Sequence, residues 1–258
     1  FKDYRADLGI LGSKWVGFNN FRYFFESPDF LNVAWNTIYL NARFILTGMI
    51  AAVALGIILY ELKSRMATKL YQTVLITPYF ISWVIVGYMV YGFLNAEHGI
   101  LNRILINMGL GRVNLYAAPA PWPNILNGVS IWKSIGIDSV LYYAALMGID
   151  STLFEAADID GANRWQKIKY VTLPSIEPII VIQLILKIGG IFRADFGLFY
   201  QVTQDIGILY PTTDVMDTYI FRTMRTLRDY GMSSAAGVLQ SVVGFVLVMI
   251  TNTIVNKI

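Results

Sequence analysis

Five long apolar blocks run through this chain, and they limit what it can fold into more than any other feature. They cover residues 36–62, 70–94, 125–149, 177–200 and 235–255. Each has roughly the 20 residues that a helix needs to cross ~30 Å of hydrocarbon. Backbone groups in lipid must be bonded within their own segment, so we expect helices. The sequence therefore predicts an all-α, polytopic membrane protein with a kink at Pro78 in the second span.

Composition supports this fold class and excludes several kinds of partner. Hydrophobic residues make up 56% of the chain and charged residues 14%, whereas soluble domains carry about 25% charged residues. The blocks lack the alternation of an outer-membrane barrel, and they are too many and too long for the buried helices of a soluble protein. The chain has no cysteine, and its net charge of +3 is scattered. We therefore expect no disulfide, no metal site and no nucleic-acid partner.

The sequence offers no catalytic centre. His98 is the only histidine, and it lies in a loop without a nucleophile spaced to use it. The glycines at 189 and 190 follow no strand, so they form no phosphate loop, and the chain has no G-x-x-x-x-G-K-[ST] sequence for nucleotide. We expect a protein that is not an enzyme and holds no cofactor of its own.

The connections between the blocks predict a topology. Residues 1–32 form an amphipathic segment with Phe21, Phe24 and Phe25 on one face, which is typical of a helix on the membrane surface. We assign this segment to the extracytoplasmic side and residues 33–258 to the membrane domain. Basic residues are densest in the short connections 61–69 and 150–175, which predicts that these are cytoplasmic. Residues 95–124 and 201–234 then lie on the other side, the latter with a surface helix around Tyr219 and Arg222.

The connection 150–175 is polar and densely punctuated. Thr152 and Glu155 have the spacing of a capping box at the start of a helix that runs to residue 160. Gly161 can adopt the positive φ that ends a helix, and Asn163 can cap a second helix. Pro174 is expected to end that helix.

The segment 151–174 is therefore predicted to be a helical hairpin. Two short helices with an apolar side are not stable alone in water, so they need a surface to pack on. That surface is either a partner protein or the membrane domain of the same chain, in which case the hairpin is an ordinary loop.

This hairpin resembles the EAA signature of the membrane subunits of binding-protein-dependent ABC importers. The matching residues are Glu155-Ala156-Ala157, then Gly161 after three residues, then Val171-x-Leu173-Pro174 after nine more. Val171 stands where isoleucine is commoner. The stretches "WVGFNNFRYFF", Asn36-Thr37, Pro78 and "DYGMSSAAG" are similar to the sugar-permease branch, and within it to importers of complex oligosaccharides such as alginate and pectin fragments.

The resemblance implies a type I importer permease with one further span ahead of this sequence, in the bacterial cytoplasmic membrane. It implies that the hairpin is a coupling helix that docks on a separate ATPase subunit. The implied partners are a second permease, two ATP-binding subunits that hold ATP and Mg, an extracytoplasmic solute-binding protein and an oligosaccharide. The implied coupling residues are Glu155, Ala156, Ala157, Asp158, Gly161, Leu173 and Pro174.

Charges at membrane depth point to a substrate path. They are costly there unless they face a cavity or a partner charge, and neither Lys133 nor the mid-span Lys187 has an obvious partner on its own helix. Resembling permeases take their substrate contacts from the helices just before and after the hairpin. In this sequence those candidates are Ser130, Trp132, Lys133, Ser134, Asp138, Gln183, Lys187, Gly190 and Ala194.

The excess of cations predicts an acidic oligosaccharide, with Trp132 stacking on sugar rings. A neutral sugar bound by hydrogen bonds alone, with the lysines paired to the second permease, is the alternative. Two other classes of protein remain open. A secondary transporter coupled through Asp138 would work without ATP, and a non-transporting membrane scaffold would show no flux with its partners.

Overall fold

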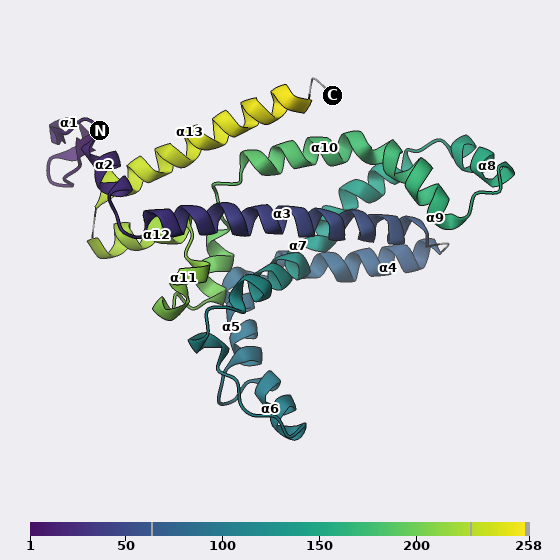
Figure 1. Ribbon diagram of the computed structural model, residues 1–258, viewed down its shortest axis with the longest axis horizontal. Coiled ribbons are helices and arrows are strands. Elements are labelled where there is room, and N and C mark those ends of the chain that lie inside the picture. Colours follow the sequence, from purple (N-terminus) through teal and green to yellow (C-terminus); the bar gives the residue numbers. More distant parts are fainter. Residues whose placement is uncertain (63, 228, 256–258) are drawn as a thin grey trace. The chain divides into compact units, whose positions relative to one another are not determined.

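The computed structural model describes residues 1–62, 64–227 and 229–255, and the side chains of Tyr23, Phe24, Leu227, Ile254 and Val255 lie outside this description. It divides into two compact units. Unit 1 contains residues 1–42, 82–126 and 188 onward, and unit 2 contains residues 43–81 and 127–187. The elements, in chain order (Figure 1), are β1 (Lys2–Asp3), α1 (Gly9–Gly12), β2 (Lys14–Trp15), α2 (Asn19–Phe25), α3 (Phe30–Tyr60), α4 (Arg65–Ile76), η1 (Thr77–Phe80), α5 (Trp83–Leu94), α6 (Ile100–Asn107), η2 (Leu115–Ala117), α7 (Trp122–Met147), α8 (Ser151–Ile159), α9 (Arg164–Lys167), η3 (Ile168–Thr172), α10 (Leu173–Gly189), η4 (Leu198–Val202), η5 (Gly207–Leu209), α11 (Tyr210–Thr213), α12 (Met216–Arg222), η6 (Thr223–Leu227) and α13 (Tyr230–Val255).

Long apolar helices dominate, as the blocks predict. Among the described residues, three helices are long and apolar enough to cross a membrane: α3, the continuous helix Arg164–Gly189, and α13. The pair α4 and α5 adds a fourth if it is counted as one broken span. The third expected span is the 26-residue helix α7. Polar residues such as Lys133 and Asp138 keep its hydropathy below that of these three helices.

The second expected span is interrupted rather than kinked. Pro78 lies in a 3-10 turn, and Ile81 and Ser82 are extended. The Ser82 hydroxyl accepts a hydrogen bond from the backbone N–H of Ile85, 3.4 Å away, and so starts α5 as a new helix. A continuous second span is therefore wrong.

The fourth expected span is displaced at both ends. Pro174 was expected to end a helix, but it lies in the first turn of α10, and the helix continues to Gly189. This is possible because the π-helical turn η3 precedes it, which relaxes the backbone where the proline ring would clash. After Gly189 the chain leaves the helix until residue 196, so a span to residue 200 is wrong.

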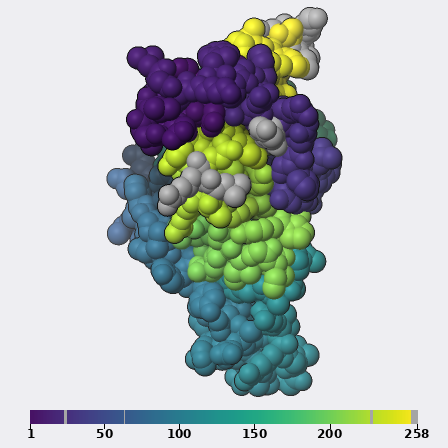
Figure 2. All heavy atoms as spheres, turned by 90° about the vertical axis from the view of Figure 1, so that its left-hand side faces the viewer, coloured from purple at the N-terminus to yellow at the C-terminus, as the bar shows by residue number. Residues whose placement is uncertain are grey.

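Unit 1 is built around a small apolar core. Val33, Met216 and Ala236 are at most 1% exposed and pack together. The N-terminal segment begins with a two-stranded antiparallel pair, in which Lys2 faces Trp15. Its helix α2 packs against the first turn of α13, where a side chain at Gly231 would collide with Asn20. Figure 2 shows this segment, in purple, lying over the yellow-green end of the same unit.

Unit 2 holds its helices together by close backbone approach. A Cβ at Gly136 of α7 would lie 2.0 Å from the carbonyl oxygen of Leu75, and one at Gly56 of α3 would lie 3.0 Å from the Cβ of Tyr142. Small residues at such contacts are typical of helix packing in membranes. Thr47 also donates a hydrogen bond of 2.8 Å to the side-chain oxygen of Asn127, which ties α3 to α7.

Candidate coupling hairpin and substrate path

The N-cap of the first hairpin helix is Asp150, two residues before the Thr152 that the sequence predicts. Asp150 is the N-cap of α8, and its carboxylate accepts a hydrogen bond of 3.0 Å from the backbone N–H of Thr152. This hydrogen bond lowers the pKa of Asp150. A capping box of Thr152 and Glu155 is therefore wrong. The reason is that Asp150 already occupies the cap position, which places Thr152 inside the helix.

The turn and the second helix agree with their local signals. Gly161 has φ +72°, which confirms its role in the turn. Asn163 and Gln166 form a reciprocal capping box with hydrogen bonds of 3.0 and 2.7 Å. Lys167 of the second helix forms an ion pair with Asp158 of the first, so Asp158 closes the hairpin from within.

The hairpin is anchored at its base and exposed at its tip. In unit 2, Arg164 forms an ion pair of 3.0 Å with Glu61 at the end of α3, and the rings of Tyr60 and Phe154 lie 6.1 Å apart. By contrast Ile159 is 87% exposed and Trp165 is 78% exposed.

The remaining coupling candidates differ in how exposed they are. Glu155, Ala156 and Pro174 are exposed, while Ala157 and Leu173 are partly covered. The hairpin thus presents carboxylates, including that of Glu155, and large apolar side chains, including those of Ile159 and Trp165, outward on a base that its own chain holds.

The buried ammonium group of Lys133 has hydrogen-bond partners. Its ammonium group donates hydrogen bonds to three carbonyl oxygens at the break after α4, those of Pro78, Tyr79 and Ile81, at 3.1, 2.8 and 2.5 Å. Lys133 as a whole is 8% exposed. A cation at the carbonyl end of a helix is favourable because the unsatisfied carbonyls carry partial negative charge. Lys133 therefore stabilises the interruption that divides α4 from α5.

Lys187 is also paired. Its ammonium nitrogen lies 3.3 Å from Asp138 Oδ2, so the two expected membrane charges neutralise each other across α7 and α10. Lys187 lies in the last turn of α10 rather than in the middle of a span. Gln183 joins the pair in lining a small cavity of about 100 Å³ within unit 2. Both lysines, which have no obvious partner on their own helices, therefore find partners on other elements of unit 2.

The other path candidates occupy different parts of the chain. Ser130 and Ser134 share one face of α7, where the Ser134 hydroxyl donates to the Ser130 carbonyl at 2.9 Å. Trp132 of the same helix is 41% exposed. Gly190 and Ala194 belong to unit 1, in the non-helical stretch that follows α10. Within unit 2, the structure brings together Asp138, Gln183 and Lys187.

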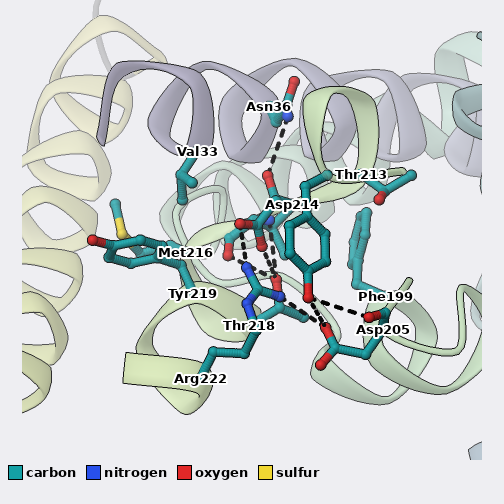
Figure 3. A network of polar contacts seen from close by, with 12 residues as sticks. Val33, Asn36, Phe199, Asp205, Thr213, Asp214, Met216, Thr218, Tyr219 and Arg222 are labelled. Carbon is teal, nitrogen blue, oxygen red and sulfur yellow. Dashed lines mark hydrogen bonds and ion pairs between the residues drawn. The ribbon is translucent and has the colours of Figure 1, made fainter. Parts of the chain in front are cut away.

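Unit 1 contains an ionic network that the sequence did not reveal (Figure 3). Arg222 forms ion pairs with Asp205, at 2.8 Å, and with Asp214. Its guanidinium carbon lies 3.9 Å from the ring centre of Tyr210. Thr218 donates a hydrogen bond of 2.7 Å to Asp214, which is 5% exposed. Burial raises the pKa of Asp214, and the hydrogen bonds from Arg222 and Thr218 oppose this shift.

This network corrects the expectation of a surface helix around Arg222. Met216 is fully buried, and Arg222 turns inward to its two carboxylates. Beside the network lies a hollow of about 620 Å³, whose lining includes Asp29 and Thr226. Charge alternation alone could not distinguish a solvated arginine from one that is paired inside the fold.

Together the apolar helices define a polytopic membrane protein that carries an exposed helical hairpin. Comparison with known proteins gives the family. Residues 45–258 match the binding-protein-dependent transport system inner membrane component family. The chain belongs to this family and is a permease subunit of an ABC importer, a transport component of the inner membrane that works with a solute-binding protein.

Individual relatives agree along the full chain. Protein LplB of Bacillus subtilis is 34% identical over 100% of this chain and 80% of its own length. The polygalacturonan/rhamnogalacturonan transport system permease protein YteP of Bacillus subtilis is 32% identical over 100% of this chain and 79% of its own. A bacterial ABC transporter involved in the import of the acidic polysaccharide alginate has a chain with TM-score 0.89 and 36% identity, matching 95% of this chain and 85% of its own.

Proposed function

We propose that this chain is one of two permease subunits that import an acidic oligosaccharide, such as a uronate oligomer, by ATP-driven alternating access. The observation that carries the proposal is the hairpin 151–174. Its EAA residues sit on a base fixed to α3, and its apolar tip, including Ile159 and Trp165, is exposed. Exposed apolar groups of this size at a defined turn fit a partner surface.

The energy then comes from other chains. Two ATP-binding subunits hold ATP and Mg, and each receives one coupling hairpin, this chain supplying one and the second permease the other. Glu155 is placed to meet a basic group of the ATPase, while Asp158 keeps the hairpin closed through Lys167. Closure of the ATPases moves the hairpins and turns the membrane cavity toward the solute-binding protein.

The acidic substrate is supported by chemistry and by relatives. The ion pair of Asp138 and Lys187 lines a cavity next to Gln183. A sugar carboxylate can take the place of Asp138 as the partner of Lys187, while the partly exposed Trp132 stacks on a sugar ring. One relative is described as importing the acidic polysaccharide alginate, and YteP as transporting polygalacturonan and rhamnogalacturonan.

The test is uptake by liposomes that carry the complete complex. We expect uptake of a uronate oligomer only with ATP on the ATPase side and binding protein on the other. Uptake that persists without ATP and follows a proton gradient would instead identify a secondary transporter. Absence of uptake with all partners present would indicate that the protein is a non-transporting membrane scaffold.

The same liposomes test the substrate class. Lys187→Gln should lower the uptake of a uronate oligomer about tenfold, the effect of losing one charge-assisted hydrogen bond, and change that of a neutral oligomer of equal length much less. Lys69→Gln, a change of an exposed lysine on α4, is the matched control. Equal handling of both oligomers by the wild type, unchanged in Lys187→Gln, would contradict the acidic substrate.

A further inference from the structure

The backbone leaves the helix directly after α10, at a place where the sequence predicts the middle of a span. Residues 190–195 are non-helical, and only short turns bond them internally, such as the 2.8 Å hydrogen bond from the N–H of Arg193 to the carbonyl of Gly190. Backbone N–H and C=O groups that are partly buried outside a helix need hydrogen-bond partners. In this protein the polar groups of the segment need partners from elsewhere.

Side chains from three helices of unit 1 supply those partners. Asn41 of α3 donates hydrogen bonds to the carbonyls of Ile191, at 2.7 Å, and of Arg193, at 3.3 Å. Gln240 of α13, which is 6% exposed, donates to the carbonyl of Phe192 at 2.8 Å. Three consecutive carbonyls are thereby held by amide side chains that come from outside the segment.

Asp217 of α12 holds the following residue. Its carboxylate accepts a hydrogen bond of 2.7 Å from the backbone N–H of Ala194 and another of 3.3 Å from Gln240. Arg193 donates to the Ser241 hydroxyl at 3.0 Å. Asp217 and Gln240 each bind the segment and also bind each other, so the pair links the backbone of Phe192 to that of Ala194. Burial raises the pKa of Asp217, and the two hydrogen bonds oppose this shift.

The next turn is fixed as tightly. The indole N–H of Trp83 donates to Asp195 at 2.9 Å, and a Cβ at Gly197 would lie 2.1 Å from the Trp83 ring. Asp195 also accepts from the backbone N–H of Leu198 at 3.2 Å and so starts the helical turns that follow. The segment is therefore anchored at both ends as well as in its middle.

We propose that residues 190–195 form a rigid, non-helical wall of the substrate path, and that Asp217 is the positioning residue that sets its shape. This inference rests on the proposed function, because Gly190 and Ala194 are candidates for the substrate path through the resemblance of the chain to sugar permeases. Asp217 contacts no substrate. It acts through the backbone N–H of Ala194, while Asn41 holds the carbonyl of Arg193 in the same peptide group and Gln240 holds the carbonyl of Phe192 before it.

The cysteine-free sequence allows a direct test in the full complex. Ala194→Cys reports the wall, and Leu11→Cys, at a residue 93% exposed on the N-terminal segment, reports general access of the reagent. We expect loaded binding protein and ATP turnover to slow thiol labelling at position 194 and leave position 11 unchanged. We expect Asp217→Asn to raise the labelling rate at 194 about tenfold, the usual effect of losing one charge-assisted hydrogen bond.

Transport by the same variants completes the test. Asp217→Asn keeps the size of the side chain but turns an amide N–H toward Gln240 or Ala194, so oligosaccharide uptake should fall about tenfold while basal ATP hydrolysis stays the same. Gln240→Met, a second variant of similar length, should act in the same direction if Asp217→Asn does not fold. Asp229→Asn is the matched control, because asparagine caps α13 as well as aspartate does.

The outcomes separate the inference from the function beneath it. Labelling at 194 that ignores both Asp217→Asn and Gln240→Met would overturn the positioning role even if uptake is normal. Labelling at 194 that substrate does not protect would overturn the wall. Absence of ATP-driven uptake by the wild-type complex would overturn the proposed function itself.

Discussion

The hairpin 151–174 and the network around Arg222 are both polar, but they treat their charged and apolar groups in opposite ways. The hairpin turns Ile159 and Trp165 outward, and its ion pair of Asp158 and Lys167 lies at the surface. The Arg222 network turns its charges inward, onto an Asp214 that is 5% exposed.

We interpret this difference as one between a region proposed to dock on another chain and a region that is complete within its own unit. In the hairpin the local geometry is defined by caps and a glycine, yet the apolar tip has no cover from the described part of the chain. In the network each described donor and acceptor that is buried has a partner in the same unit. Changes in the hairpin should therefore uncouple the protein without unfolding it, and changes in the network should destabilise it.

Gly161→Pro should have the largest effect on transport. Proline fixes φ near −65°, whereas Gly161 has φ +72°, so the turn cannot form. We expect loss of uptake and of substrate-stimulated ATP hydrolysis in the reconstituted complex, with normal insertion of the chain. Gly161→Asn, which tolerates a positive φ, should retain most activity. Equal loss in both variants would show that something other than the turn is involved.

Arg222→Met should have the largest effect on stability. It leaves Asp205 and Asp214 without their cation, and breaking such a pair costs about 3–5 kcal/mol. We expect a clear fall in the Tm of the purified complex, with Arg225→Met, at an exposed arginine on the next turn, as control.

The same variant has a predicted pH dependence. Burial raises the pKa of Asp214 above its unfolded value, so the protonated carboxyl is favoured in the fold. That contribution is present at low pH and is lost as pH rises through the folded pKa. The Tm deficit of Arg222→Met should therefore shrink on acidification. A deficit that grows as pH falls would contradict this reading of Asp214.

Lys133→Met should have an intermediate effect. It removes the donor to three carbonyls at the break after α4, and a hydrogen bond to a charged group is worth about 1.5–3 kcal/mol. We expect a lower Tm and reduced uptake of acidic and neutral oligomers alike. Lys69→Met is the control. A loss confined to acidic substrates would instead place Lys133 in contact with the sugar.

Asp150→Ala should have the smallest effect, and it tests which residue caps α8. The variant loses the hydrogen bond from Thr152, whereas Thr152→Val should leave coupling unchanged. The pKa of Asp150 is lowered in the fold, so its contribution is present above the unfolded pKa and is lost as pH falls through the folded pKa. Measuring the coupling ratio of both variants at neutral and acidic pH checks this. A larger effect of Thr152→Val than of Asp150→Ala would show that Thr152, and not Asp150, caps α8.

Features that depend on neighbours in sequence were predictable. The long apolar blocks predict membrane helices, Gly161 predicts the turn, and Asn163 with Gln166 predicts the second cap, because each acts within one or two helical turns. Asp150 was missed because two good capping residues lie two positions apart, and only the backbone shows which of them starts the helix.

Features that depend on distant partners were not predictable. Lys133 meets carbonyls 52 to 55 residues earlier in the chain, and Lys187 meets Asp138 49 residues away. Charge periodicity on one helix contains no information about such partners. For the same reason Asp217 carries no local signal that it holds the segment after α10.

Glu155→Lys provides the most direct test of the central claim, that the hairpin transmits ATP hydrolysis to the membrane domain. The measurement is ATP hydrolysis stimulated by loaded binding protein, together with uptake, in the reconstituted complex. Glu97→Lys, at an exposed carboxylate of another loop, is the control. The account predicts a loss of about tenfold or more in stimulated hydrolysis, equivalent to ~1.4 kcal/mol, with uptake abolished and Tm unchanged. Wild-type stimulation and uptake in Glu155→Lys would contradict it.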